Sequence, residues 1–118
     1  NPESQAYVGM MYEKGDRLPK DMEKAAKMYL LGARQGYAVA QEKLAECYAF
    51  GEGAPKDLPE ALKWNILGAR GGDADAAENE RGLRSLMRPA DIAEGERRAA
   101  AFRPKRTGIA YEAVVHRN

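Results

Sequence analysis

The chain has 118 residues, of which 19 are Lys or Arg and 18 are Asp or Glu, so its formal net charge is +1 with the single His neutral. This balance argues against a nucleic-acid binder, which normally carries a strongly basic face, and gives no reason to expect attraction to a membrane. No apolar run approaches the roughly 20 residues needed to cross a bilayer. One cysteine, Cys47, excludes an intrachain disulfide.

A repeat of 36 residues organises the first 72 positions. Aligning residues 5–36 with residues 41–72 gives 13 identities in 32 positions, whereas shared composition would give roughly two or three. A period of this length indicates stacked helical hairpins, in which neither helix of a pair can bury its apolar face alone.

The first predicted unit spans about residues 2–37 and holds two helices. Gly15 can end the first helix in the left-handed conformation, and Asp21 can cap the first turn of the second. Gly9 inside the first helix would cost up to about 1 kcal/mol relative to Ala, so we expect the neighbouring helix to approach closely there. Gly36 ends the second helix.

Residues 38–72 repeat this arrangement with stronger signals. Asp57 and Glu60 have the spacing of a capping box, and Pro59 suits the first turn of a helix. Alanine and glycine at the contact points should let helix axes approach, while large side chains fill the wedges between them. These large residues are Tyr12, Tyr29, Leu44, Tyr48 and Trp64. Asn65 is an exception, because it is polar at the position that Tyr29 holds in the first unit.

The third unit is partial. A helix begins on schedule at Asp73, but no glycine-rich loop follows within residues 73–88, and Pro89 begins a last helix over residues 89–103. Charged residues cover the outer face of this helix, as a terminal cap facing water requires. Its inner face carries Ile92, Gly95, Ala99 and Phe102.

The second unit contains a recognisable motif, formed by Ala40-Gln41, Leu44, Tyr48, Gly51-Glu52-Gly53, Asp57, Ala61, Trp64, Ala69 and Gly72. This pattern resembles the Sel1-like repeat, a relative of the tetratricopeptide repeat. The first unit departs from it, since Val8 replaces the Leu, Met28 replaces the Trp, and Asp16-Arg17 occupies the region of the second loop glycine. The resemblance implies an all-α, right-handed α-α superhelix over residues 1–104 that ends in a capping helix, as in many bacterial relatives.

The same resemblance implies a non-enzymatic protein–protein interaction module, in a bacterial scaffold or regulatory protein, without a cofactor. In related repeats the first helices line the inside of the superhelix, so residues beside their core stripe would face a ligand. These residues are Met10, Glu13, Glu42, Glu46 and Glu78. They predict a groove for a basic or amine-bearing peptide with an apolar anchor. The alternative that these carboxylates are merely solvated stays open.

The usual enzyme and metal signatures are missing. The only histidine, His116, lies in the tail, so one chain cannot assemble a His-based triad or a histidine zinc site. Cys47 is better explained as a buried, inert thiol than as a nucleophile. Neither Ser4 nor Ser85 begins a Ser-x-x-Lys motif, and residues 51–53 lack the preceding strand and the Gly-Lys-Ser/Thr ending of a phosphate loop.

Residues 105–118 form a tail in which apolar residues alternate weakly, as in a strand without a partner. Three interpretations compete: disorder, docking on the chain's own surface, and insertion into the groove of another copy. The last would make this a structural or self-associating segment, the alternative function. We favour some form of docking, because the tail is too apolar to be at ease in water. Because the helical pattern is already under way at Asn1, the sequence is consistent with a piece of a longer protein, and the compartment, bacterial cytoplasm or periplasm, stays open.

Overall fold

A computed structural model describes residues 1–105 and contains six α-helices of 13 residues each. They are α1 (Pro2–Lys14), α2 (Met22–Arg34), α3 (Ala38–Phe50), α4 (Leu58–Arg70), α5 (Ala74–Leu86) and α6 (Pro89–Ala101). The described residues include no strand, so the predicted all-α architecture is confirmed. The predictions of tail docking and tail exchange concern residues 106–118 and lie outside the described part.

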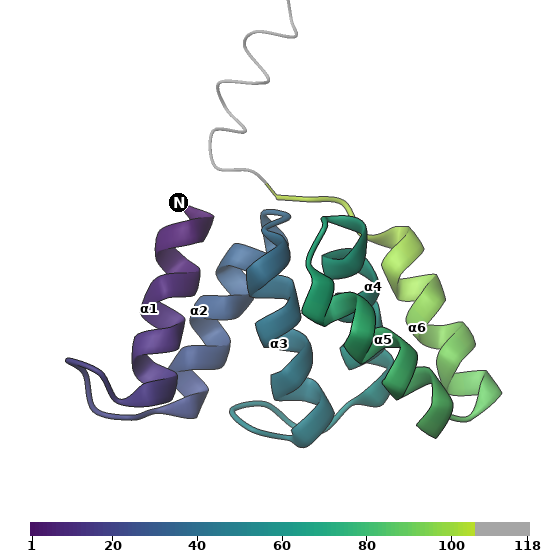
Figure 1. Ribbon diagram of the computed structural model, residues 1–118, viewed down its shortest axis with the longest axis horizontal. Helices are drawn as coiled ribbons and strands as arrows, with labels where there is room; N and C mark the ends of the chain where they lie inside the picture. The colour runs from purple at the N-terminus through teal and green to yellow at the C-terminus, as the bar shows by residue number, and fades with distance from the viewer. Residues whose placement is uncertain (106–118) are drawn as a thin grey trace, which may run out of the picture.

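The helices stand side by side in an open array of antiparallel pairs (Figure 1). α1 packs against α2 and α3 against α4, while α2 and α4 also pack against the first helix of the next unit. α1 in addition touches α3, and α3 touches α5. We therefore call α1, α3 and α5 the inner wall, and α2 and α4 the outer wall. No described helix has both the length and the apolar character of a membrane span.

Local signals in the sequence explain where the helices begin and end. The side chains of Asp21, Asp57 and Asp73 each accept a hydrogen bond from the backbone N–H three residues ahead, at 3.1, 3.0 and 2.9 Å. Each bond satisfies an amide that the first turn of a helix leaves unpaired. Gly15 ends α1 with φ 72°. The predicted caps at Asp21 and Asp57 and this helix end are confirmed. The capping box at Asp57 is only half formed, because the Asp57 N–H donates to the carbonyl of Tyr48 and not to Glu60.

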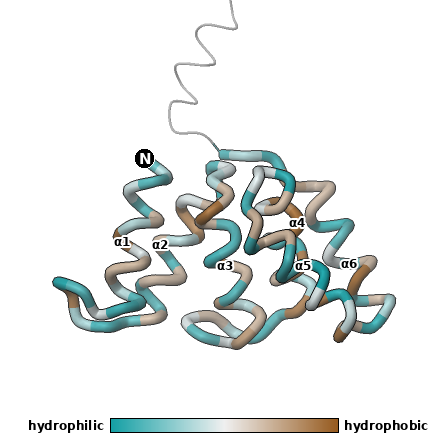
Figure 2. Tube along the Cα trace, viewed as in Figure 1, coloured by the Kyte–Doolittle hydropathy of each residue, from teal (hydrophilic) through white to brown (hydrophobic). Residues whose placement is uncertain are grey.

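The core combines small contact residues with a few large side chains, as the sequence predicts. Trp64, Tyr29, Leu44 and Leu62 are the largest fully buried side chains. At the α1–α2 contact, a Cβ on Gly9 would lie 2.6 Å from the Tyr29 ring. The expected close approach at Gly9 is therefore confirmed. Figure 2 shows strongly hydrophobic positions in α4, the helix against which α3, α5 and α6 all pack.

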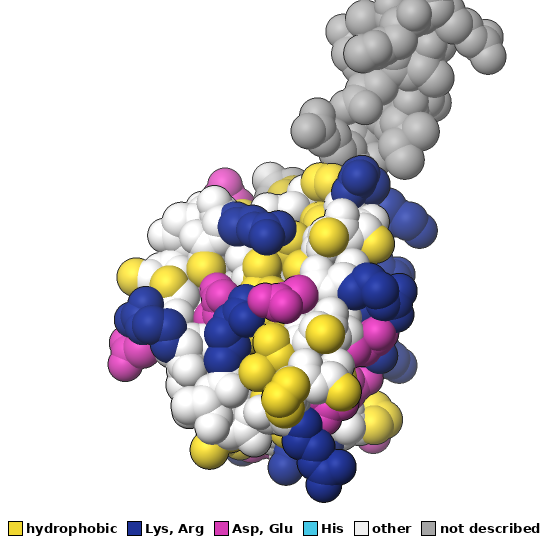
Figure 3. Space-filling view, turned by 90° about the vertical axis from the view of Figure 1, so that its right-hand side faces the viewer, with side chains coloured by type: hydrophobic (Ala, Val, Ile, Leu, Met, Phe, Trp, Pro, Cys, Tyr) yellow, Lys and Arg dark blue, Asp and Glu magenta, His cyan; other side chains and the backbone are white. Residues whose placement is uncertain are grey.

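The third unit departs from a regular hairpin, because both α5 and α6 pack on α4. Gly95 lets α6 approach α4 so closely that a Cβ there would lie 2.9 Å from Leu62. Arg98 of α6 reaches the carboxylates of Glu60 at 3.1 Å and Asp57 at 3.4 Å. On the end face that α5 and α6 form, hydrophobic and charged side chains are interspersed, and charged ones also lie near its middle (Figure 3).

Beyond α6 the chain turns back across the outer wall (Figure 1). Phe102 packs edge-on against Trp64, with ring centroids 5.4 Å apart. The backbone N–H of Lys105 then donates a hydrogen bond of 2.6 Å to the carbonyl of Arg34, the last residue of α2. We call residues 102–105 the return segment. It joins the cap of the array to its first unit.

Candidate functional site

The inner wall carries the five residues predicted to face a partner, but their surroundings differ. Glu13 and Glu46 are half-buried, and Glu78 is exposed on α5. Met10 is half-buried and packs against the hydrophobic core. Glu42 is only 5% exposed. Of the predicted set, therefore, Glu42 is not available to a partner as a surface carboxylate.

A small pocket of about 140 Å³ lies between the C-terminal ends of α1 and α3. We call it the inner pocket. Its walls are formed by Glu13, Met22, Lys43, Glu46, Cys47, Phe50 and Glu52. It brings together two of the predicted site residues, Glu13 and Glu46, with Phe50, whose side chain is 70% exposed.

Phe50 is a residue that sequence reasoning missed. Its exposure could have been predicted, since the 36-residue repeat aligns Phe50 with Lys14. A position that accepts lysine in one unit faces water and not the core. Leu86, the next residue in this series, is 82% exposed. The ends of the first helices α3 and α5 thus both present a large apolar side chain to solvent.

Buried neighbours hold Glu13 in place. The hydroxyl of Tyr29 donates a hydrogen bond of 2.5 Å to Glu13 Oε1. Burial, and next the hydrogen bond to Glu13, raise the pKa of Tyr29 far above its ordinary value, so this hydroxyl stays a donor. Burial, followed by the Glu13 carboxylate, also raises the pKa of Cys47 to about 12. This supports the interpretation of Cys47 as an unreactive thiol, because the thiolate is the nucleophile.

Glu42 faces α5 and belongs to the contact between units. Its Oε2 accepts a hydrogen bond of 3.2 Å from Asn79 Nδ2 on α5. Burial, and next the hydrogen bond to the Glu46 carboxyl, raise the pKa of Glu42 to about 8. A largely protonated carboxyl that is covered by a neighbouring helix contributes little charge to the surface. The acidity of the groove therefore comes from the other carboxylates.

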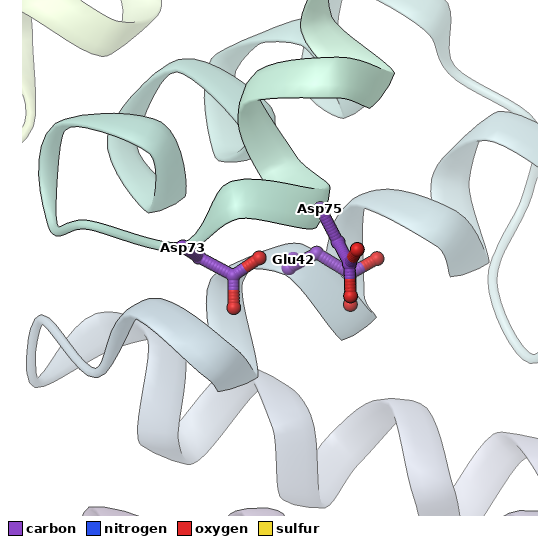
Figure 4. A group of neighbouring side chains, drawn as sticks. All are labelled: Glu42, Asp73 and Asp75. Atoms are coloured by element: carbon purple, nitrogen blue, oxygen red, sulfur yellow. The ribbon is translucent and has the colours of Figure 1, made fainter.

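Glu42 also forms part of an acidic cluster with Asp73 and Asp75 (Figure 4). One oxygen of each lies within 4.8 Å of the others, and oxygen ligands suit hard cations. However, Asp73 caps α5 by accepting the Ala76 N–H, and Glu42 holds a proton near neutral pH. Two of the three carboxyls thus have structural tasks that compete with metal binding.

A second pocket, of about 240 Å³, lies on the outer wall under the return segment. We call it the outer pocket, and no sequence pattern pointed to it. Its walls are formed by Leu30, Arg34, Tyr48, Glu60, Lys63, Trp64, Phe102, Arg103 and Lys105. The pocket exists because the return segment closes over α2 and α4, a contact between residues far apart in the sequence.

The open array of hairpins, with its two walls and terminal cap, defines an all-α repeat solenoid. A model of the Sel1 repeat family matches residues 2–37 and 38–73. The chain therefore belongs to the Sel1 repeat family. Proteins of this family generally mediate protein–protein interactions and are typically non-catalytic scaffolds.

Two solved structures resemble this fold. One is a protective antigen of uropathogenic Escherichia coli strains that displays an SLR fold, with a TM-score of 0.84 and 22% identity, covering 86% of this chain and 22% of the antigen. The other is a Sel1 repeat protein from Oxalobacter formigenes, with a TM-score of 0.69 and 36% identity, covering 70% of this chain and 24% of that protein. The chain thus spans about a quarter of either relative. No curated protein matches it.

Proposed function

We propose that this chain is a protein–protein interaction module whose inner wall binds a peptide or protein partner that carries basic and apolar side chains. The observation that supports this most is the inner pocket, where Glu13 and Glu46 lie beside the exposed ring of Phe50. Carboxylates next to an exposed aromatic side chain suit a partner in which Lys or Arg flanks an apolar residue.

The charge of the inner pocket favours a cationic partner. Glu13, Glu46 and Glu52 contribute three carboxylates to its walls, and Lys43 is its only basic residue. Lys43 lies 4.0 Å from Glu46 in an ion pair whose side chains are 29% and 44% exposed. Such exposed pairs contribute at most about 1 kcal/mol. A basic side chain of a partner can therefore replace Lys43 as the neighbour of Glu46 at small cost.

The apolar part of the proposed contact is the ring of Phe50. Because this ring is 70% exposed to water, a partner that covers it gains the favourable free energy of burying an aromatic side chain. Glu78 on α5 would extend the acidic surface along the wall, since it is exposed. Met10 and Glu42 would act indirectly, by holding α1, α3 and α5 together.

Selection from a library of random 12-residue peptides on the immobilised chain tests this proposal. We expect the enriched peptides to carry Lys or Arg beside an aromatic or aliphatic residue. Their affinity should fall with added salt, and Glu46→Lys should weaken binding at least about fivefold because it reverses one charge at the contact.

Glu96→Lys provides the matched control. Like Glu46, Glu96 is about half exposed and pairs with one basic residue, Arg84 at 2.8 Å, but it lies on α6 and does not line the inner pocket. Selected peptides should bind this variant as they bind the unchanged chain. Enrichment of acidic or featureless peptides, or equal losses in the two variants, would contradict the proposal.

A further inference from the structure

The outer pocket concentrates positive charge that the inner wall lacks. Four of the charged side chains around it are basic: Arg34, Lys63, Arg103 and Lys105. They come from α2, α4 and the return segment, which meet only in the folded chain. Since the chain as a whole has a net charge of only +1, this is a local excess.

The single acidic residue of the outer pocket does not cancel that excess. Glu60 accepts a hydrogen bond of 3.1 Å from Arg98 of α6 and lies 3.6 Å from the ammonium group of Lys63. One carboxylate is therefore shared between two cations. Among residues 1–105, no carboxylate lies within ion-pair distance of the guanidinium of Arg34.

The walls beneath these cations are aromatic. Trp64, Tyr48 and Phe102 all line the pocket, and the Lys63 ammonium lies 4.4 Å from the centroid of the Trp64 ring. Trp64 is 2% exposed, yet its indole N–H has no hydrogen-bond acceptor among the described residues. An unpaired buried donor is unfavourable, and such donors in native proteins call for an explanation.

We propose that the outer pocket binds an acidic peptide segment, in which an Asp or Glu side chain sits next to an aromatic or aliphatic one. The carboxylate would lie among the basic side chains at the rim, above the buried Trp64, and the apolar side chain would pack on the aromatic walls. This site lies on the opposite wall from the inner pocket and takes the opposite charge, so it does not rest on the function proposed above.

Trp64 makes the proposal directly measurable, because it is the only tryptophan in the chain. We would follow its fluorescence while titrating the full chain with the peptide acetyl-Gly-Glu-Phe-Glu-Gly-amide. The probe for comparison is acetyl-Gly-Gln-Phe-Gln-Gly-amide, which differs only in charge. The acidic peptide should give a saturable change, at least about tenfold tighter than the neutral one, and should weaken as salt is added.

Two arginine variants distinguish binding at the outer pocket from a general effect of losing one positive charge. Arg34→Gln removes a cation that lines the outer pocket, and Arg70→Gln removes its equivalent 36 residues later, which is exposed and lies outside the pocket. Both variants should melt like the unchanged chain, and only Arg34→Gln should weaken the acidic peptide, by at least about fivefold. Equal binding of the two peptides, no saturable change, or equal effects of the two variants would overturn the proposal.

Discussion

The same substitution should have opposite effects at two helical glycines, because their surroundings differ. At Gly9 a Cβ would lie 2.6 Å from the buried ring of Tyr29, whereas at Gly82 nothing lies within 4 Å. We expect Gly9→Ala to lower the free energy of unfolding by about 1–3 kcal/mol through overpacking. Gly82→Ala should raise it by up to about 1 kcal/mol, since Ala favours the helix.

Urea denaturation followed by circular dichroism would measure both glycine variants. If Gly9→Ala were neutral, α1 would have to move away from α2 without loss, and the packing described here would be incorrect. Gly82→Ala serves as the control, because it changes helix propensity alone.

Backbone conformation accounts for one position at which the first unit departs from the repeat pattern, the second glycine of the loop. Arg17 adopts φ 67°, at the position where the second unit has Gly53 with φ 76°. A left-handed conformation costs a residue with a side chain about 1–2 kcal/mol. At Gly53 a side chain is excluded in any case, because its Cβ would overlap the carbonyl oxygen of Met22. The two loops thus share one shape although their sequences differ.

At the scale of helices, the contact between α3 and α5 should depend on pH. The pKa of Glu42 is raised to about 8 in the folded chain, above the value of about 4.3 expected when unfolded. Between these values the folded state holds a proton that the unfolded state has released, so stability should fall as pH rises from about 5 to about 8. Above the folded pKa, a buried charge would face Glu46, Asp73 and Asp75.

Glu42→Gln tests this directly, because it keeps an acceptor for Asn79 and has no proton to lose. We expect the variant to match the unchanged chain near pH 5 and to be more stable by at least about 1 kcal/mol near pH 8. The control is Glu78→Gln, the same substitution at the equivalent, exposed position of the next unit. Thermal melts from about pH 5 to about pH 8 would measure the stability of both variants and of the unchanged chain. A pH-independent difference for Glu42→Gln, or an equal response of Glu78→Gln, would count against a buried, protonated Glu42.

The helices were predictable from the sequence because their signals are local. Asp21 and Asp57 cap, Gly15 and Gly51 terminate, and the 36-residue period pairs the helices. The site was only partly predictable. Counting angles around α3 placed Glu42 beside the core stripe, but α5 covers that flank, and helix angles alone do not reveal a third helix.

The outer pocket could not be predicted for a related reason. It depends on the return segment, where Lys105 meets Arg34 across 71 positions of sequence. Neither residue belongs to a motif, and no periodicity extends to both. Contacts of this kind follow from the completed fold and leave no trace in local patterns.

At the scale of the whole molecule, the two walls of this Sel1 repeat chain differ in charge. The inner pocket has three carboxylates and one lysine, and the outer pocket has four basic residues and one glutamate. Because the total charge nearly cancels, net charge alone conceals this separation. If both proposed sites bind their partners, the chain would hold two partners of opposite charge at once.

The central claim, that the inner wall is the surface that binds a partner, is tested most directly by mapping the contact residue by residue. A ¹H–¹⁵N NMR titration of the labelled full chain with the tightest basic peptide from the library would do this. We expect shift changes to centre on Glu13, Glu46 and Phe50 and to fade toward the outer pocket. Changes confined to the outer wall, with the inner pocket undisturbed at saturation, would contradict the claim.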